Sequence, residues 1–417
     1  MVRTSTGIDG SVVNKMQLAI GHVITESTPF GGAQRNTLLT LEGLMRDGYR
    51  PELICGPGGP LIDKAAACGV PVHVLESLIR TVAPVQDYRT LMALYKLFRA
   101  RRYHIVHTHS TKAGLLGRLA AWWAGVPIII HTVHGYPFEM DNALRARAYT
   151  TVERWIGHIT DALVCVGEAV RQEVAEWRWV PPEKLVTIYS GIDFSSYIPQ
   201  STAAETKRRL GLEGSWPIVG SIGHLVEAKA QHYLIEAIAL LRKQYPRIRL
   251  LLVGGGRLCA ALKEQVRCLQ LQSHIVLLGE RGDIADLLNV FDLYAMSSRY
   301  EGVGRALTEA MYWGLPVVAT SVNGVKELVI HEETGLLVPP RDPSAIASAI
   351  DRLVSNPALA QRLGANARVK ASALMDSRQM VKALEQLYGR LIGPGPTRTS
   401  ACNHNAYRQD NCVQRHI

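Results

Sequence analysis

The chain has 417 residues, of which 47% are hydrophobic and 20% charged, as in a soluble globular protein long enough for two domains. No apolar run reaches the roughly 18 residues that cross a bilayer, so we expect no integral membrane protein. A formal net charge of +10 is compatible with binding to a nucleic acid, an anionic lipid or a phosphorylated ligand. Aromatic residues make up only 6% of the chain and no nucleic-acid module is evident, so we expect no nucleic-acid partner.

The cysteines and the N-terminus predict a cytoplasmic protein. The seven cysteines are odd in number and form no Cys-x-x-Cys pair, which argues for reduced thiols and against a disulfide framework or a zinc site. Residues 1–16 are polar and lack the apolar core of a signal peptide. We therefore expect a flexible N-terminus and no export.

The first predicted strand leads into a glycine turn. Residues 17–25 alternate and then run apolar, and Gly31-Gly32 precedes a helix that closes at Asp47-Gly48. A helix N-terminus after such a turn presents free backbone N–H groups and can bind an anion. The alternative is an ordinary tight turn of a doubly wound fold.

Strands and helices then alternate through the first part of the chain. Strands are expected at 52–55, 71–75, 104–107, 127–132 and 162–166, and helices near 87–102, 111–124, 141–159 and 167–177. This alternation, with continuously apolar strands, predicts a parallel sheet that is covered on both faces. Ligands of such sheets bind beyond the carboxyl ends of the strands.

Four histidines follow two of these strand ends: His107, His109, His131 and His134. They could form a metal site, or they could simply hydrogen-bond and pack. No Asp or Glu is interleaved with them before Glu139, and we therefore expect no bound metal.

Basic residues are concentrated in the segment 88–118, which carries seven Lys or Arg and no Asp or Glu. Because Leu94 and Phe98 lie on the same predicted helix, the segment is either a solvated face over a core stripe or a surface that docks on an anionic membrane. Lys112, at the start of the next predicted helix, is either a ligand of an acceptor phosphate or a solvated lysine.

A second set of alternating elements follows a polar linker near 195–204. Its first strand ends near His224 and is followed by Lys229, and a later strand ends before Arg281 and Ile284. These residues therefore lie at predicted ligand-binding edges of a second sheet.

Residues 298–319 predict a strand end, a glycine-bearing loop, a helix and a second buried strand. Gly302 and Gly304 allow a close approach to a ligand, and a helix that begins near Gly304 aims free N–H groups into the crevice. Glu301 and Glu309 would repel phosphate, but their carboxylates accept hydrogen bonds from sugar and ribose hydroxyls. The alternative is a helix start whose glutamates favour the helix dipole and contact only water.

The whole stretch resembles a known signature. It runs from Glu301-Gly-Val-Gly304 through Glu309-Ala-Met and Gly314-Leu-Pro-Val-Val-Ala319 to residues 323–327, Asn-Gly-Val-Lys-Glu. This pattern is similar to the Glu-x7-Glu signature of family 4 retaining glycosyltransferases, and supporting matches extend the resemblance over residues 17–390.

The resemblance implies an α/β fold of the GT-B type, in which two facing, doubly wound, Rossmann-like domains enclose the active site. We expect an acceptor-side domain over 17–198 and a nucleotide-sugar donor domain over 199–375. A crossover helix over 376–392 is expected to return to the first domain. Residues 393–417 lack apolar periodicity and predict a disordered tail.

The resemblance also implies a reaction. It is the retaining, metal-independent transfer of a sugar from a nucleotide-diphosphate donor, which serves as co-substrate, without any other cofactor. Elements such as Val-His134-Gly-Tyr-Pro-Phe resemble bacterial enzymes of surface-polysaccharide assembly. That implies a polyprenyl-diphosphate-linked glycan as acceptor and a peripheral position on the cytoplasmic face of the membrane.

By the same resemblance, three residues carry the chemistry: His134 beside the transferring sugar, Glu301 at its hydroxyls and Lys229 at the leaving diphosphate. The implied donor-binding residues are Gly31, Gly32, His224, Arg281, Ile284, Val303, Gly304, Arg305, Ala306 and Glu309. The candidate acceptor-binding residues are His109 and Lys112.

Two positions depart from the family pattern, which has an arginine where this chain has His224 and a glycine where it has Ala230. An imidazole is only partly charged near neutral pH and lacks the guanidinium fork. The His224 replacement keeps one alternative open, a catalytically weak subunit that binds a nucleotide sugar. A second alternative is a nucleotide-sugar epimerase of the same fold, against which the Glu301/Glu309 signature argues.

Overall fold

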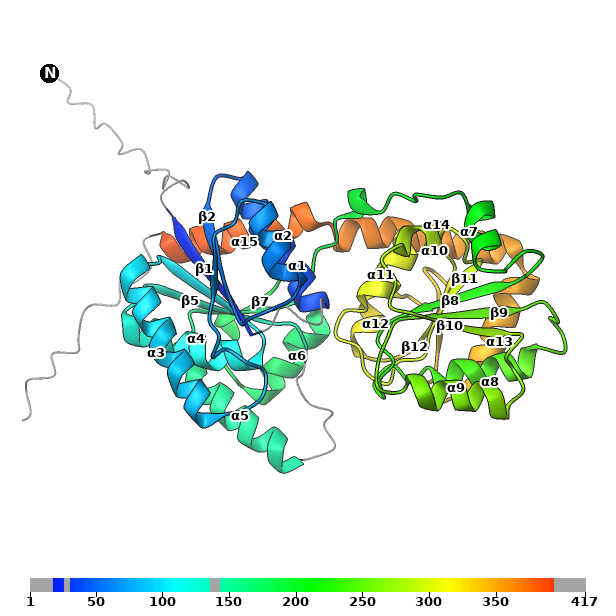
Figure 1. Ribbon diagram of the computed structural model, residues 1–417, viewed down its shortest axis with the longest axis horizontal. Coiled ribbons are helices and arrows are strands. Elements are labelled where there is room, and N and C mark those ends of the chain that lie inside the picture. Colours follow the sequence, from blue (N-terminus) through cyan, green and yellow to red (C-terminus); the bar gives the residue numbers. More distant parts are fainter. Residues whose placement is uncertain (1–17, 26–30, 136–142, 394–417) are drawn as a thin grey trace, which may run out of the picture.

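Two parallel sheets organise the protein, one in each domain (Figure 1). The computed structural model describes residues 18–25, 31–135 and 143–393. The predicted flexible N-terminus and the tail beyond residue 393 lie outside the described residues. Within them, no helix is long and apolar enough to cross a membrane.

The N-terminal sheet has seven strands in the order β3-β2-β1-β4-β5-β6-β7. The strands are β1 (Ala19–Ile24), β2 (Arg50–Cys55), β3 (Val72–Val74), β4 (Ile105–His109), β5 (Ile128–Val133), β6 (Ala162–Cys165) and β7 (Leu185–Thr187). The helices between them are α1 (Gly32–Arg46), α2 (Pro60–Ala67), α3 (Pro84–Arg101), α4 (Thr111–Ala124), α5 (Ala143–Gly157) and α6 (Glu168–Trp177). Every residue of the central strands β4 and β5 is buried, as expected for a parallel sheet with helices on both faces.

The C-terminal sheet has six strands in the order β10-β9-β8-β11-β12-β13. The strands are β8 (Ile218–Ile222), β9 (Arg249–Val253), β10 (Ile275–Gly279), β11 (Leu293–Met296), β12 (Val317–Thr320) and β13 (Leu336–Val338). The helices are α7 (Ala203–Arg209), α8 (His232–Leu241), α9 (Cys259–Cys268), α10 (Ile284–Leu288), α11 (Arg305–Tyr312), α12 (Asn323–Leu328), α13 (Pro343–Ser355) and α14 (Pro357–Leu374). The predicted fold class, two doubly wound α/β domains, is therefore confirmed. The domain boundaries that we drew at 198/199 and 375/376 remain predictions.

The last helix, α15 (Ser377–Ile392), returns to the N-terminal domain and packs on α1, as predicted (Figure 1). The Asp376 carboxylate caps its start by accepting a hydrogen bond from the Arg378 N–H at 2.6 Å. Its apolar face is buried in one cluster with β1, β4 and β5. The members of that cluster from α15 are Met380, Val381, Leu384, Leu387 and Tyr388.

Gly43 is the residue that lets α1 and α15 approach each other. A Cβ atom at this position would lie 2.4 Å from one γ-carbon of Val381 and 3.0 Å from the other, so no rotation of the valine would relieve the overlap. Gly389, on α15, is exposed, and a Cβ there would meet nothing within 4 Å.

These two glycines give opposite predictions. Gly43→Ala is expected to lower the free energy of unfolding by about 1–3 kcal/mol through overpacking. Gly389→Ala is expected to raise it by about 0.5–1 kcal/mol, because alanine is the better helix former. Urea unfolding of both variants, compared by midpoint, measures the effect; equal midpoints would show that α15 does not pack on α1 in solution.

Candidate active site

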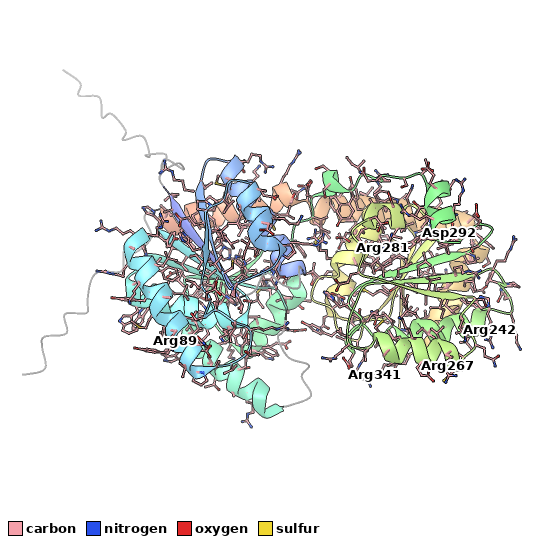
Figure 2. All side chains as sticks on the ribbon, viewed as in Figure 1. Arg89, Arg242, Arg267, Arg281, Asp292 and Arg341 are labelled. Atoms are coloured by element: carbon pink, nitrogen blue, oxygen red, sulfur yellow. The ribbon has the colours of Figure 1, made fainter. Side chains whose placement is uncertain are left out.

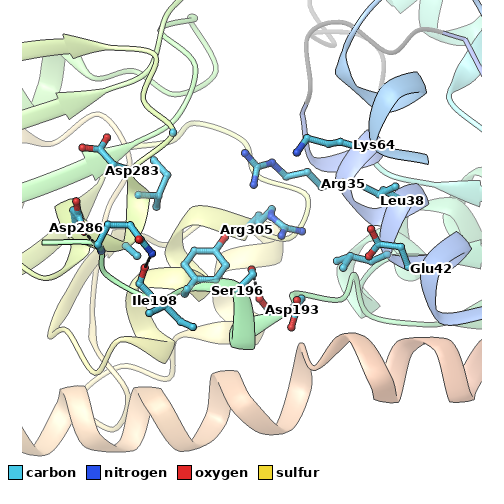
Figure 3. Close-up of a pocket in the computed structure, with 16 residues that line it drawn as sticks. Arg35, Leu38, Glu42, Lys64, Asp193, Ser196, Ile198, Asp283, Asp286 and Arg305 are labelled. Atoms are coloured by element: carbon cyan, nitrogen blue, oxygen red, sulfur yellow. Dashed lines mark hydrogen bonds between the residues drawn. The ribbon is translucent and has the colours of Figure 1, made fainter. Parts of the chain in front are cut away.

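A cavity of about 440 Å³ opens between the two domains (Figure 3). Its N-terminal side is formed by α1 and α2, including Arg35 and Lys64. The connecting segment 193–200 forms its floor, and the start of α10 together with Arg305 forms its C-terminal side. Cationic side chains thus approach the cavity from both domains.

Three predicted donor-binding residues lie at this cavity. Ile284 and Arg305 line it, and Arg281 adjoins its lining residue Gly282. The Arg281 guanidinium donates to the Asp283 carboxylate, with Nε 2.8 Å from Oδ1. This contact holds the pKa of Asp283 below its usual value. Arg281 and Asp283 are therefore engaged with each other, and Asp283 also accepts from Arg209 at 3.0 Å.

Glu309 is held at the junction of α11 and the connecting segment. It is only 6% exposed, and its Oε1 accepts hydrogen bonds from Arg305 Nε at 3.0 Å and from the Tyr197 hydroxyl. Arg305 Nη1 also donates to the Gly191 carbonyl at 3.1 Å. Burial raises the pKa of Tyr197 and keeps its phenol protonated as a donor.

Helix α11 begins where the sequence predicted it. Gly304 is its N-cap and has φ +68°, in the left-handed region that glycine tolerates best. Ala306 packs partly buried on the C-terminal core, and Val303 packs on apolar clusters of both domains. Val303 therefore contributes to the contact between the domains, in addition to any part it has in donor binding.

The Lys229 ammonium and the Glu301 carboxylate form an ion pair. Their side chains are 27% and 12% exposed, and Glu301 Oε2 also accepts a hydrogen bond from Ser298 Oγ at 3.3 Å. Lys229, predicted to bind the diphosphate, and Glu301, predicted to bind the sugar, are therefore in direct contact. Charges that are this far buried need partners, and here each supplies the other.

The two departures from the family pattern flank this ion pair. His224 is exposed at the end of β8, and its carbonyl accepts a hydrogen bond from Gln231 Nε2 at 2.9 Å. Ala230 has φ +50°, a conformation that glycine would adopt without strain. The replacement of glycine by Ala230 therefore costs backbone energy immediately after Lys229.

Gly31 and Gly32 form the N-cap and first residue of α1, as predicted. The Gly31 N–H donates to Gln34 Oε1 at 3.2 Å, and a Cβ on Gly32 would meet nothing within 4 Å. The same helix carries Arg35 into the cavity (Figure 3). The helix that this turn begins therefore reaches the space between the domains.

His134 brings the N-terminal domain to the Glu301 loop. It follows β5, and a Cβ on Gly302 would lie 3.4 Å from the His134 carbonyl oxygen. The side chain is half-buried, and burial lowers the pKa of His134 to about 4, so the imidazole is neutral near pH 7. The three predicted catalytic residues thus lie on facing loops of the two domains.

The predicted acceptor contacts of His109 and Lys112 remain predictions, and both side chains have partners within the protein. His109 is 1% exposed and lies behind His134, with its Nδ1 3.1 Å from His134 Nε2. Lys112 pairs with Asp87 and donates to the Thr81 carbonyl at 2.5 Å. An acceptor phosphate would have to displace these partners, because the positive charge of Lys112 is already neutralised.

Glu327, which the sequence indicates only as the last residue of a motif, connects the two domains. It lies on α12, yet its Oε2 accepts a hydrogen bond from the Glu168 N–H at 2.9 Å, and its Oε1 accepts one from the Ala169 N–H. These N–H groups belong to the first turn of α6 in the other domain, where the helix dipole favours a carboxylate. Glu327 therefore ties the two domains together, a role for which the sequence carries no local signal.

Comparison with known proteins identifies the family. The profile described as "Glycosyltransferase Family 4" matches residues 30–196, and that described as "Glycosyl transferases group 1" matches residues 203–370. An Escherichia coli protein named "UDP-Gal:alpha-D-GlcNAc-diphosphoundecaprenol alpha-1,3-galactosyltransferase" is 32% identical over 333 residues, which cover 79% of this chain and 86% of that protein. The chain is a family 4 glycosyltransferase.

Other relatives of this glycosyltransferase agree with that assignment. The Staphylococcus aureus "Capsular polysaccharide biosynthesis glycosyltransferase CapM" is 24% identical over 325 residues, which cover 77% of this chain and 85% of that protein. The crystal structure of Anabaena HepE in complex with UDP and glucose has a TM-score of 0.77 at 23% identity, over 89% of this chain and 100% of that one. This likeness confirms the GT-B fold.

The contact of Glu327 with α6 generates a prediction for this glycosyltransferase. Glu327→Gln removes the negative charge and one strong acceptor, so the amides of Glu168 and Ala169 should exchange with deuterium about tenfold faster. Glu333→Gln, at an exposed position on the same domain, is the control and should leave both amides unchanged. Equal exchange in both variants would show that the domains do not make this contact in solution.

Proposed function

We propose that this glycosyltransferase moves a sugar from a nucleotide-diphosphate donor to a polyprenyl-diphosphate-linked glycan, with retention and without a bound metal, in surface-polysaccharide assembly. The observation that carries the proposal is the meeting of His134 with the Glu301 loop, which leads directly to Arg305 in the lining of the cavity. The printed names of the Escherichia coli and Staphylococcus aureus relatives support the acceptor class and the polysaccharide.

The cavity suits the nucleoside end of the donor. Its volume of about 440 Å³ lies within the range of small-molecule sites. We propose that the base binds near Arg281 and Ile284 and that Glu309 accepts hydrogen bonds from the ribose hydroxyls. The Tyr197 hydroxyl, which now occupies Glu309 Oε1, would yield to the ribose.

The departing diphosphate gains negative charge in the transition state, and fixed positive groups stabilise it. Lys229, the free N–H groups at the start of α11 and the Gly31-Gly32 turn are the groups that we propose for this role. Lys229 would leave Glu301 for the diphosphate, which frees the Glu301 carboxylate to accept hydrogen bonds from the transferring sugar. The Lys229–Glu301 ion pair would thus supply one ligand of the diphosphate and one ligand of the sugar.

We propose a front-face reaction in which the leaving phosphate assists the acceptor hydroxyl. The acceptor oxygen forms its bond to the anomeric carbon on the face from which the diphosphate departs, and its proton passes to a diphosphate oxygen. The two domains would exclude water from the oxocarbenium-like sugar. No protein carboxylate is assigned as nucleophile.

A specific observation keeps the second function open. His224 is exposed in place of the family arginine, and Ala230 is strained in place of the glycine. Both changes lie next to the proposed diphosphate site, so a subunit that binds a nucleotide sugar but transfers it slowly is the alternative. Membership of the glycosyltransferase family argues against the epimerase.

A turnover screen tests the proposal. Purified full-length protein is supplied with UDP- and GDP-sugars and with undecaprenyl-diphosphate N-acetylglucosamine, with and without EDTA. We expect acceptor-dependent transfer that resists EDTA. Glu301→Ala and Lys229→Ala should each lower kcat/KM by about 10²-fold or more, because each removes a contact that stabilises the transition state.

Glu333→Ala is the matched control, since it removes an exposed glutamate of the same domain, and it should keep full activity. Donor binding without transfer, followed by transfer in a His224→Arg/Ala230→Gly double variant, would replace the proposal with the weak-subunit alternative. Transfer that EDTA abolishes would contradict the metal-independent mechanism.

We also propose that α3, α4 and α5 dock this enzyme on an anionic membrane. Their exposed apolar side chains include Val85, Tyr88, Trp122, Trp123 and Trp155. Their exposed charged side chains are Arg89, Lys96, Arg99, Arg101, Arg147 and Arg154, and the described residues of these helices expose no Asp or Glu (Figure 2 labels Arg89). Tryptophan and arginine together are the side chains that favour a lipid interface.

This surface predicts binding to lipid vesicles. Wild-type protein should bind phosphatidylglycerol vesicles more strongly than phosphatidylcholine vesicles, and binding should weaken with salt. Trp122→Ser/Trp155→Ser should weaken it about tenfold or more, because apolar area no longer leaves water. Leu240→Ser removes an exposed side chain of similar exposure from the C-terminal domain and should have no effect; equal loss in both variants would refute the surface.

A further inference from the structure

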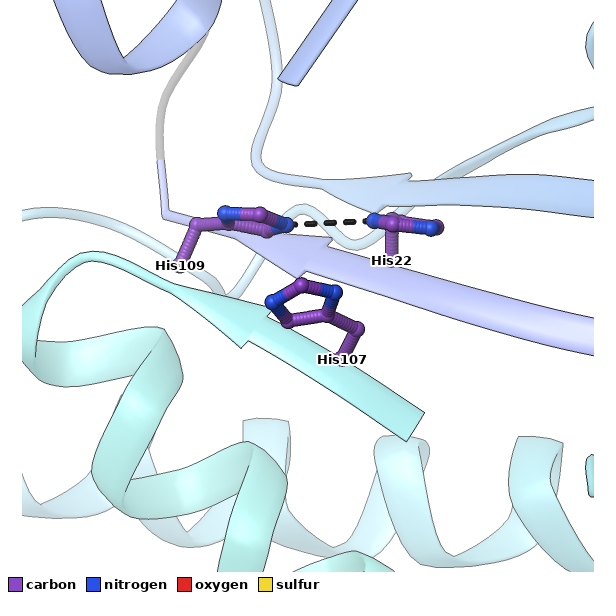
Figure 4. Close-up of side chains that lie close together, drawn as sticks. All are labelled: His22, His107 and His109. Carbon is purple, nitrogen blue, oxygen red and sulfur yellow. Dashed lines mark hydrogen bonds between the residues drawn. The ribbon is translucent and has the colours of Figure 1, made fainter. Parts of the chain in front are cut away.

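A row of three imidazoles leads from the cleft into the centre of the N-terminal sheet. His134 Nε2 lies 3.1 Å from His109 Nδ1, and His109 Nε2 lies 3.1 Å from His22 Nδ1. His134 directly follows β5, His109 is the last residue of β4 and His22 lies within β1, and these three strands are neighbours in the sheet. Figure 4 shows the two buried members, His22 and His109, which are 0% and 1% exposed.

The rings of this row meet head to head. In both pairs the ring centroids are 5.4 Å apart, which exceeds the nitrogen separation of 3.1 Å by about two ring radii. The two nitrogens of each pair therefore lie close to the line that joins the centroids. That is the geometry of a straight N–H···N hydrogen bond, in which the lone pair of one ring points at the proton of the next.

His107 lies beside this row, and its ring nitrogen comes within 4.8 Å of those of His22 and His109, close enough for a metal site to be considered. A metal binds in the plane of each imidazole, at about 2.0–2.1 Å for zinc. Two nitrogens that point at each other across 3.1 Å leave no such position between them.

The third ring does not converge on that position either. His107 stacks on His109 with centroids 4.5 Å apart, and its nitrogens bond to the Tyr388 hydroxyl at 2.7 Å and to Thr132 Oγ1 at 2.6 Å. The arrangement is that of a hydrogen-bonded chain, with His107 packed against its side.

The direction of the hydrogen bonds in this row of imidazoles follows from its buried end, His22 Nε2. Burial lowers the pKa of His22 to about 3 and the pKa of His109 well below its ordinary value, so each neutral ring has one N–H and one lone pair. His22 Nε2 is buried and has no partner among the described residues. A buried N–H without an acceptor is rarer than a buried lone pair without a donor, so the proton of His22 belongs on Nδ1.

The rest of the chain follows from that proton. His22 Nδ1–H donates to His109 Nε2, which places the proton of His109 on Nδ1. His109 Nδ1–H then donates to His134 Nε2, which places the proton of His134 on its own Nδ1. The half-buried His134 thus has an N–H at the ring nitrogen that faces away from His109.

We propose that His22 and His109 are positioning residues that hold His134 in the Nδ1–H tautomer, so that it offers the cleft a hydrogen-bond donor and no lone pair. In this form His134 can donate to a hydroxyl or ring oxygen of a sugar, but its protonated Nδ1 cannot take a proton from the acceptor. The identity of the sugar ligand rests on the proposed function; the tautomer does not. This assignment agrees with a reaction in which the leaving phosphate, and not a histidine, receives the proton.

Nitrogen-15 NMR of the full-length protein, labelled at histidine, tests the tautomer without substrate. Wild type should show Nδ1–H for His22, His109 and His134, assigned through single His→Asn variants. His22→Leu removes the first donor, so His134 should show a mixture of Nδ1–H and Nε2–H. His22→Asn keeps an N–H donor near the position of Nδ1 and should restore the single tautomer. An Nε2–H His134 in wild type, or a His134 that His22→Leu does not change, would overturn the proposal.

Kinetics add a readout that a structural role alone would not produce. Transfer by His22→Leu should show kcat lowered about fivefold, the worth of one net hydrogen bond, with KM for the donor unchanged and with recovery in His22→Asn. His131→Gln is the control, because His131 is buried in the same sheet but bonds to Thr108 Oγ1, outside the chain. This control should leave the tautomer of His134 unchanged. If His131→Gln changed the tautomer as much as His22→Leu does, any buried histidine would have this effect, and the proposed hydrogen-bonded row would be wrong. If no transfer is found with any donor, the tautomer measurement still decides this proposal.

Discussion

The packing of α15 on α1 is the contact on which the arrangement of the two domains depends. Helix α14 belongs to the C-terminal domain, and α15, which begins at Ser377, belongs to the N-terminal domain. At the crossing, the Ile192 N–H donates to the Met375 carbonyl at 2.7 Å, and the Ser377 N–H donates to the Ile192 carbonyl at 3.1 Å. The two passages of the chain are therefore tied side by side, and the binding edges of both sheets are held at one cleft.

The same helix supports the active site from behind. The Tyr388 hydroxyl, on α15, is 2.7 Å from His107 Nδ1, and His107 stacks on His109. His109 in turn contacts His134, which faces the Glu301 loop of the other domain. Two hydrogen bonds and one ring stack thus connect the interdomain helix with the cleft. Such contacts are rigid because a buried polar group that loses its partner is costly.

The charged side chains of the cleft are paired with each other, so a bound ligand would replace the partner of each one. Lys229 pairs with Glu301, and Arg305 pairs with Glu309. A nucleotide-diphosphate sugar offers anionic phosphate to the cations and hydroxyl donors to the carboxylates. The donor would therefore replace each ion pair with two new contacts, and no charge would be left buried without a partner.

The sequence by itself determined the features that depend on neighbouring residues. Alternating apolar strands and helices predicted both sheets, and the stretch from Glu301 to Glu327 predicted the family. Gly304 predicted the start of α11, because a left-handed residue before a helix is a local property of the backbone.

Tertiary structure decided the rest. The hydrogen bond between His22 and His109 joins residues that are 87 positions apart, and the one between Glu327 and Glu168 joins residues that are 159 positions apart. The sequence offered an acceptor phosphate or water as the partner of Lys112, and the fold adds an ion pair with Asp87, 25 positions away. Such pairings depend on the register of strands and the docking of helices, which many residues fix together and which no short segment of the sequence specifies.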